Sequence, residues 1–451
     1  MTKYFKITNL TPVFIVVFIL MFYIPIFSNF SNTSTIQDEL TPPVLDIQTS
    51  NQGFINETGQ EVFWFIHITD LHIPKSNVIN NFNIFLNDTC EIINPSFIIN
   101  TGDLVNGINF GLTRDINQWH TYQNLLTKNN AELSYYIDLM GNHDVSANTD
   151  YTPFLQYSML GSRIYDVNYS FTRNFSFGNY AFICLDTVKD DPYDFPYLDF
   201  GFDGFIYTDD LDWYESKLEE YKDYDNIFTF SHHPDASSRD YNLISELSSS
   251  KLSFAQLTDK YNVSCHISGH THENHFEERN DVFKIETNDF KTAGAYRIIA
   301  MDHGEISTSI AKVGTWPQYV VTYPPSNKFA PNDFVNNENK IRILAWHPDG
   351  INSVKWSAYN NTNSNQITPW KSLSILNHDR PLWEGEWNST LNGRDNYEIR
   401  VRVTEISDLS DDSPNNSQNP FRFIPIIIIG GILISSCSIM GAIFYVLDQD
   451  K

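Results

Sequence analysis

Short apolar runs alternate with amphipathic segments through much of the chain. The apolar runs have the length of buried strands and fall at residues 61–68, 96–100, 134–139, 226–230 and 262–267. The segments between them carry apolar residues at helical spacing, at 78–93, 115–126, 211–221 and 252–261. Strands that alternate with helices predict an α/β sheet with crossover connections, in which ligand sites gather at the carboxyl ends of the strands.

The pattern changes after residue 317. Apolar and polar positions alternate there in short runs without intervening helices, at 341–346, 354–356, 382–387 and 397–403. We therefore expect a small immunoglobulin-like β-sandwich over residues 317–407. Four tryptophans are expected to fill its core, namely Trp346, Trp356, Trp383 and Trp387.

Two longer apolar segments lie near the ends of the chain. The first, within 1–28, follows Lys3 and Lys6 and precedes no clear cleavage site, which favours a retained signal anchor over a cleaved signal peptide. The second, 423–447, is long enough for a transmembrane helix across a bilayer core of ~30 Å, with a GPI signal as the alternative. The basic N-terminus predicts that the intervening domains lie on the lumenal or extracellular side. The remaining segments are a linker at 29–60, a stalk at 408–422 and a cytosolic tail at 448–451.

Charge and cysteine content narrow the possible partners. The formal net charge of -26 disfavours binding to nucleic acid, which depends on basic residues that neutralise phosphates. The four cysteines have no zinc-finger spacing, and Cys437 lies within the C-terminal apolar segment. Neither a structural zinc site nor a disulfide framework is therefore expected.

Polar groups follow all five strand-like runs of the α/β region. They carry carboxylate, imidazole and amide side chains, namely Asp70, His72, Asp103, Asn142, His143, His232, His270 and His272. This mixture of donors, without thiolates, suits Mn, Fe or Zn. A carboxylate can bridge two metal ions ~3.5–4 Å apart, and Asp103, which follows Gly102 in a tight turn, suits that position.

The order of these groups resembles the calcineurin-like metallophosphoesterase superfamily over about residues 62–300. The shared series is D-x-H, G-D, G-N-H-D, H-H-P and G-H-T-H. The resemblance implies a layered α/β sandwich and two divalent or mixed-valence metal ions. One ion would be bound by Asp70, His72, Asp103 and His272. The second would be bound by Asp103, Asn142, His232 and His270, while His143 would face the substrate.

The whole architecture is also similar to the transmembrane protein 62 family, most closely at 65–75. Members of that family generally carry several C-terminal membrane helices, whereas one is expected here.

The expected function is hydrolysis of a phosphate monoester or diester by a membrane-anchored enzyme. The mechanism implied by the resemblance is in-line attack of water on phosphorus, with cations that activate the water and His143 at the leaving oxygen. Asp144 either orients His143 or caps the turn. The alternative function is a receptor or scaffold that retains the fold with weak or no turnover. The expected partners are a phosphate-ester substrate and the lipid bilayer.

Overall fold

The structure is a computed structural model that describes eleven segments of the chain. They are residues 53–107, 115–131, 135–145, 151–188, 203–235, 243–279, 282–325, 339–360, 363–376, 380–387 and 397–406. All of them belong to one compact unit, Leu45–Lys451.

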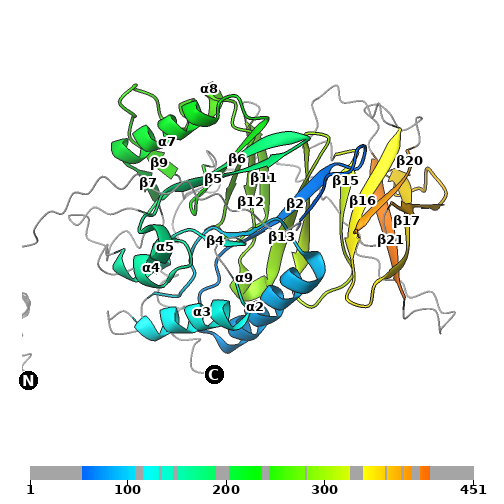
Figure 1. Ribbon diagram of the computed structural model, residues 1–451, viewed down its shortest axis with the longest axis horizontal. Helices are drawn as coiled ribbons and strands as arrows, with labels where there is room; N and C mark the ends of the chain where they lie inside the picture. Colours follow the sequence, from blue (N-terminus) through cyan, green and yellow to red (C-terminus); the bar gives the residue numbers. More distant parts are fainter. Residues whose placement is uncertain are drawn as a thin grey trace, which may run out of the picture. The chain divides into compact units, whose positions relative to one another are not determined.

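Two six-stranded sheets form the centre of the α/β region (Figure 1). The first has the order β14 (Glu305–Lys312), β13 (Ala295–Asp302), β2 (Val62–Ile68), β3 (Ile98–Asn100), β4 (Tyr136–Asp138), with β1 (Phe54–Ile55) paired to β2. The second has the order β11 (His275–Arg279), β12 (Val282–Glu286), β10 (Cys265–Ser268), β8 (Asn226–Phe230), β6 (Gly178–Cys184), β5 (Tyr169–Phe175). The central strands of each sheet are parallel.

The two sheets pack against each other through a shared apolar core. Phe65 and Ile99 of the first sheet belong to the same buried cluster as Phe182 and Phe228 of the second. Every residue of β2 is buried, because its two faces alternate between this cluster and a second cluster on the helix side. The layered α/β sandwich that the family resemblance implies is thus present.

Helices cover the outer faces of both sheets (Figure 1). α2 (Ser76–Asp88) and α3 (Ile116–Lys128) place buried residues in the core of the first sheet. α7 (Thr208–Tyr221) and α8 (Phe254–Lys260) do the same for the second sheet. Shorter helices are α4 (Thr152–Tyr157), α5 (Gly161–Ile164) and α9 (Phe290–Ala293).

Some elements differ from the predicted ones. The helix expected at 78–93 is α-helical only to Asp88 and continues as a π-helical turn, Thr89–Ile93, in which the Thr89 hydroxyl donates to the Phe85 carbonyl. β13 was not predicted either, because Arg297 interrupts its apolar residues and Asp302 ends it. Both side chains are buried and hydrogen-bonded, so they are compatible with an interior strand. The short strands β7 (Gly204–Ile206) and β9 (Leu243–Ser245) were also not predicted.

Two smaller sheets follow the α/β region. One contains β15 (Gln318–Tyr323), β16 (Lys340–Trp346), β20 (Leu382–Glu386) and β19 (Ser374–Ile375). The other contains β18 (Lys371–Ser372), β17 (Ile351–Asn360) and β21 (Tyr397–Glu405). Residues of both sheets share one buried cluster, which includes Ile343, Trp356, Trp383 and Trp387. The immunoglobulin-like assignment of this region stays a prediction.

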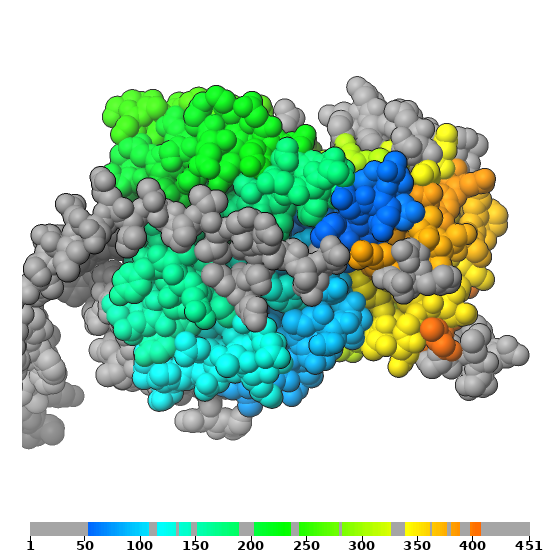
Figure 2. Space-filling model, viewed as in Figure 1, coloured from blue at the N-terminus to red at the C-terminus, as the bar shows by residue number. Residues whose placement is uncertain are grey.

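The expected position of Trp346 in that core is wrong. Its ring lies 5.7 Å from the ring of Trp64 on β2, and both belong to the core of the first large sheet. The reason is that β16 is buried on both faces: Ile341 and Ile343 face the small core, whereas Leu344 and Trp346 face the large one. The space-filling view shows the blue N-terminal strands beside the yellow and orange C-terminal sheets (Figure 2).

The predicted membrane segments, the stalk and the tail lie outside the described residues. Within the part of the chain that the structure describes, no helix is both long and apolar enough to cross a membrane.

Candidate metal centre

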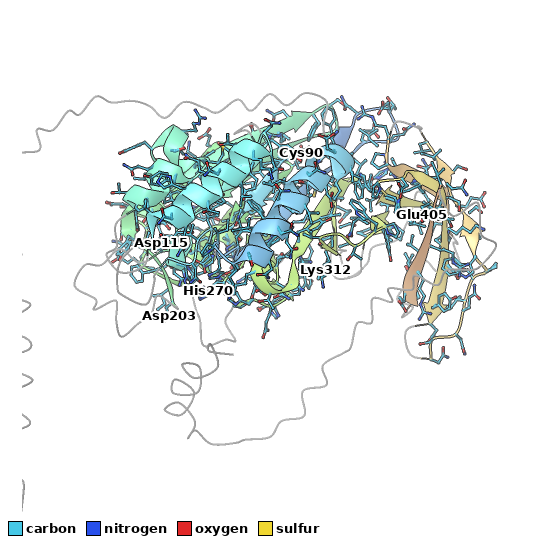
Figure 3. All side chains as sticks on the ribbon, turned by 90° about the horizontal axis from the view of Figure 1, so that it is seen from below. Cys90, Asp115, Asp203, His270, Lys312 and Glu405 are labelled. Carbon is cyan, nitrogen blue, oxygen red and sulfur yellow. The ribbon has the colours of Figure 1, made fainter. Side chains whose placement is uncertain are left out.

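All five polar groups lie just beyond the carboxyl ends of strands, as predicted. Asp70 and His72 follow β2, Asp103 follows β3 and Asn142 follows β4 in the first sheet. His232 follows β8, and His270 and His272 follow β10, in the second sheet. His270 is labelled in Figure 3, far from Glu405 at the end of β21. The site is therefore built where corresponding edges of the two large sheets meet.

The backbone at this site is held in unusual conformations. Five of the predicted site residues have positive φ angles: Asp70 (57°), His72 (48°), Asp103 (53°), His270 (71°) and His272 (56°). Such values are uncommon for residues other than glycine and concentrate at functional sites. Gly102 has a φ of 109°, and a Cβ there would lie 2.9 Å from His232 Nδ1. The turn before Asp103 therefore requires glycine.

One cluster of donors forms around Asp70. The Oδ1 atom of Asp70 lies 3.1 Å from His272 Nε2 and 3.6 Å from His72 Nε2. His72 Nε2 also lies 3.2 Å from Asp103 Oδ2. These four residues are the set that the family resemblance implies for one metal ion.

A second cluster lies on the other side of Asp103. His232 Nε2 is 3.4 Å from Asp103 Oδ1 and 3.0 Å from Asn142 Oδ1. His270 presents Nδ1 to the same place, 3.1 Å from Asn142 Oδ1 and 3.2 Å from His232 Nε2. Asp103 thus contributes one carboxylate oxygen to each cluster, which is the arrangement expected of a bridging ligand.

Burial and charge both favour cations here. Asp70, Asp103 and His232 are almost fully buried, with ligand atoms within 4.8 Å of one another. Burial opposes ionisation of Asp70, but the neighbouring imidazoles of His272 and His72 hold its pKa well below the usual value. Burial likewise opposes ionisation of Asp103, and nearby His232, His143 and His72 lower its pKa. Two adjacent buried carboxylates that stay ionised fit a site for divalent metals.

The hydrogen bonding of His72 also supports a metal site here. Both ring nitrogens of His72 are buried and lack a hydrogen-bond partner among the described residues. Buried polar atoms are nearly always hydrogen-bonded, so an imidazole of this kind suits a metal ligand. The ring of His232 is oriented by its other nitrogen. Nδ1 donates to the Thr101 carbonyl at 2.9 Å, which leaves Nε2 available to bind a metal ion at the centre.

His143 lies beside the two clusters and is more exposed than their members. Its side chain is 40% exposed, against 2% for that of Asp103. The His143 amide donates to Asp103 Oδ1 at 2.9 Å, and Nδ1 lies 3.1 Å from the Asn106 carbonyl oxygen. Nε2 lies 4.0 Å from Asp103 Oδ2. This places a titratable nitrogen at the solvent side of the centre.

The part of the chain that carries this centre also matches a known protein family in sequence. Residues 63–274 match the sequence model of the calcineurin-like phosphoesterases. This part of the chain is similar to calcineurin-like phosphoesterases and is here called the phosphoesterase domain. The resemblance predicted from the five motifs is therefore confirmed.

Individual relatives of the phosphoesterase domain are distant. The chain is 25% identical over 321 residues to Transmembrane protein 62 of Mus musculus, an alignment that covers 66% of this chain and 47% of that protein. The chain spans about half the length of the curated relatives that it matches. A dimetal phosphatase from Danio rerio is 12% identical, covering 55% of this chain and 95% of its own, with a TM-score of 0.44. GAP50, the anchor in the inner membrane complex of Plasmodium, is 17% identical to this chain. The alignment covers 56% of this chain and 85% of GAP50, with a TM-score of 0.41.

The Asp144 side chain connects the loop after β3 to the loop after β4. Its carboxylate accepts hydrogen bonds from the backbone amides of Leu104 (3.2 Å), Val105 (3.0 Å) and Gly141 (2.8 Å). Of the two roles expected for Asp144, the structure shows the one that caps the turn.

Asp144→Ala is expected to lower the free energy of unfolding by about 1–3 kcal/mol, because buried backbone amides would lose their acceptor. The midpoint of urea denaturation measures this change. Asp223→Ala, in the exposed turn after α7, is the control and should change stability by less than ~0.5 kcal/mol. Equal effects of the two substitutions would contradict the capping role.

A further buried histidine, His67, lies behind the centre. His67 is fully buried and bonds to Thr287 at 2.8 Å and to Thr101 at 2.9 Å, and burial lowers its pKa to about 3. Thr287 also accepts from Arg297 Nε at 3.0 Å. This network supports the segment whose carbonyl orients His232. His67 is therefore a neutral core histidine, whose polar partners are visible only in the structure.

Proposed function

We propose that the phosphoesterase domain hydrolyses a phosphate ester with the help of two metal ions. The observation that carries this proposal is the buried carboxylate of Asp103, which lies between His72 at 3.2 Å and His232 at 3.4 Å. Asp70, His72, Asp103 and His272 would hold one ion, and Asp103, Asn142, His232 and His270 the other. Mn, Fe and Zn all suit these donors. When bound, such ions polarise the phosphoryl oxygens and activate water for attack.

The side chains of the site have separate roles in this proposal. Thr101 holds the His232 ring through Nδ1, so that Nε2 stays directed at the centre. The Asn106 carbonyl fixes the His143 ring through Nδ1. In its protonated form, His143 donates from Nε2 to the leaving oxygen. Asp103 accepts from the His143 amide and thereby keeps this ring beside the substrate.

Membrane anchoring and a lumenal or extracellular orientation are further parts of the proposal. They are supported by the apolar segments near both ends of the chain and by Lys3 and Lys6 before the first of them. The mouse relative is also named as a transmembrane protein. Protease protection of the phosphoesterase domain in sealed membrane vesicles would test the orientation.

The function is tested with the purified full-length chain, chromogenic phosphate monoesters and diesters, and added Mn, Zn or Fe. We expect turnover that depends on metal, stops with chelator and returns when metal is restored. Metal binding without hydrolysis of any phosphate ester would instead favour the receptor or scaffold function.

His143→Ala is expected to keep both metal ions and to lower kcat by about 10²–10⁴-fold, the usual contribution of a positioned proton donor. Elemental analysis of the purified variant measures the metal, and ester hydrolysis measures turnover. His120→Ala is the matched control, because His120 is exposed on α3 and contacts Tyr157 rather than the centre. Unchanged kcat in His143→Ala would remove this residue from the mechanism.

A further inference from the structure

A short helix carries a lysine to the edge of the candidate metal centre. The backbone amide of Phe290 donates to the Thr69 carbonyl at 3.0 Å, and that of Lys291 donates to the Asp70 carbonyl at 3.1 Å. Phe290 is fully buried, with its ring 5.6 Å from that of Phe85 on α2. The Asp289 carboxylate caps the helix by accepting from the Thr292 amide at 2.9 Å. Position 291 is therefore fixed directly beside Asp70.

The side chain of Lys291 is half-buried in the field of the centre. Its ammonium group interacts electrostatically with the carboxylates of Asp70, Asp103 and Asp289, and with Lys75. No hydrogen bond or ion pair joins the ammonium group to any residue that the structure describes.

Two bound divalent ions would change the charge around this lysine. Asp70 and Asp103 would then be neutralised by the metals that they bind. A half-buried ammonium group beside a centre with excess positive charge is unfavourable unless an anion lies between them. The substrate is the anion that the proposed function brings to this place.

The number of oxygen atoms on phosphorus indicates which substrates would use Lys291. A phosphate monoester or a terminal pyrophosphate group has three nonbridging oxygens, whereas a diester has two. Two metal ions can take two of these oxygens. The third oxygen, which only a terminal phosphoryl group has, then needs a further cation.

We propose that Lys291, assisted by Lys75, binds the third nonbridging oxygen of a terminal phosphoryl group, so that the site prefers monoesters or pyrophosphates to diesters. This inference rests on the proposed function. Lys75 is exposed and lies three residues after His72, on the loop that leaves the centre. A charge-assisted hydrogen bond from the ammonium group to a phosphoryl oxygen would be the contact that distinguishes the two substrate classes.

Binding of inorganic phosphate and of dimethyl phosphate to the Mn-loaded full-length protein tests this inference without turnover. Isothermal titration calorimetry should show that Lys291→Gln weakens phosphate binding by about 10-fold or more, as expected for loss of one hydrogen bond to a charged group. The affinity for dimethyl phosphate should stay within about 2-fold, because a diester lacks the third oxygen. Lys291→Arg should retain most of the phosphate affinity.

The same substrate preference should appear in the steady-state kinetics of the variants. Lys291→Gln should lower kcat/KM for a monoester and leave kcat/KM for a diester unchanged. Lys222→Gln, at the exposed end of α7, should change neither binding nor turnover. Equal losses for both ligands, or no loss for either, would overturn the inference while metal-dependent hydrolysis by the wild type still supported the proposed function. Failure of the wild type to bind metal or to hydrolyse any ester would remove both.

Discussion

Asp103→Asn is expected to abolish metal-dependent ester hydrolysis and to release at least one metal ion. The substitution keeps the size of the side chain and an oxygen for the His143 amide, now 2.9 Å away. It removes the negative charge that the clusters share, with His72 at 3.2 Å and His232 at 3.4 Å. Loss of an outer contact to a metal ligand typically costs about 10–100-fold in affinity or activity, so loss of a bridging charge should exceed ~100-fold. Elemental analysis and ester hydrolysis measure the two effects.

The control for this substitution is Asp225→Asn. Asp225 is exposed at the amino end of β8, the opposite end of that strand from His232. Its carboxylate accepts from the Asn179 amide at 2.8 Å, which an asparagine oxygen can also do. We expect normal metal content and normal turnover. Near-normal turnover by Asp103→Asn with full metal content would show that the centre does not depend on a bridging carboxylate.

Asp302→Asn is expected to lower the free energy of unfolding by about 3–5 kcal/mol, the usual effect of leaving one charge of a buried pair uncompensated. Asp302 ends β13 of the first large sheet, and Arg342 lies on β16 of the small sheets. Their side chains are fully buried, with Arg342 Nε 3.2 Å from Asp302 Oδ2. Thr322 and His303 also bond to this carboxylate, at 2.5 Å and 2.6 Å. Chemical denaturation measures the change.

Two further variants show whether charge is the cause. Asp302→Asn combined with Arg342→Met removes both charges and should recover part of the lost stability. Glu220→Gln breaks the exposed Lys217–Glu220 pair, whose atoms are 2.8 Å apart, and should cost less than ~1 kcal/mol. If the double variant were as unstable as Asp302→Asn, the loss would come from the hydrogen bonds of Asp302 instead. The buried pair then would not be what joins the two regions.

The positions of the site residues could be predicted because they depend on local order along the chain. Each polar group follows an apolar run, and parallel strands place their carboxyl ends along one edge of a sheet. Knowledge of the strand ends was therefore sufficient to expect Asp70 and Asp103 near each other, whereas the position of His232 depends on how the second sheet packs against the first. The predicted strand 226–230 agrees with β8 to the residue. The alternation after residue 317 likewise predicted short strands, because a sheet with one buried face has a period of two.

The details of the centre could not be predicted in the same way. Positive φ angles at Asp70, His72 and Asp103 are imposed by the surrounding loops, against the preference of each residue. Which ring nitrogen of His232 faces the centre depends on the Thr101 carbonyl, 131 residues away in sequence. The capping role of Asp144 depends equally on amides from the loop after β3.

The kind of domain, the residue types of the candidate centre and their order along the strands follow from the sequence. The packing of Trp346 on Trp64, the pairing of Asp302 with Arg342 and the position of Lys291 beside Asp70 depend on the three-dimensional fold. The physical reason is that local hydrophobic periodicity reports which face of an element is buried. It carries no information about which distant element covers that face, since that choice is made by packing and by the pairing of buried charges across the whole fold.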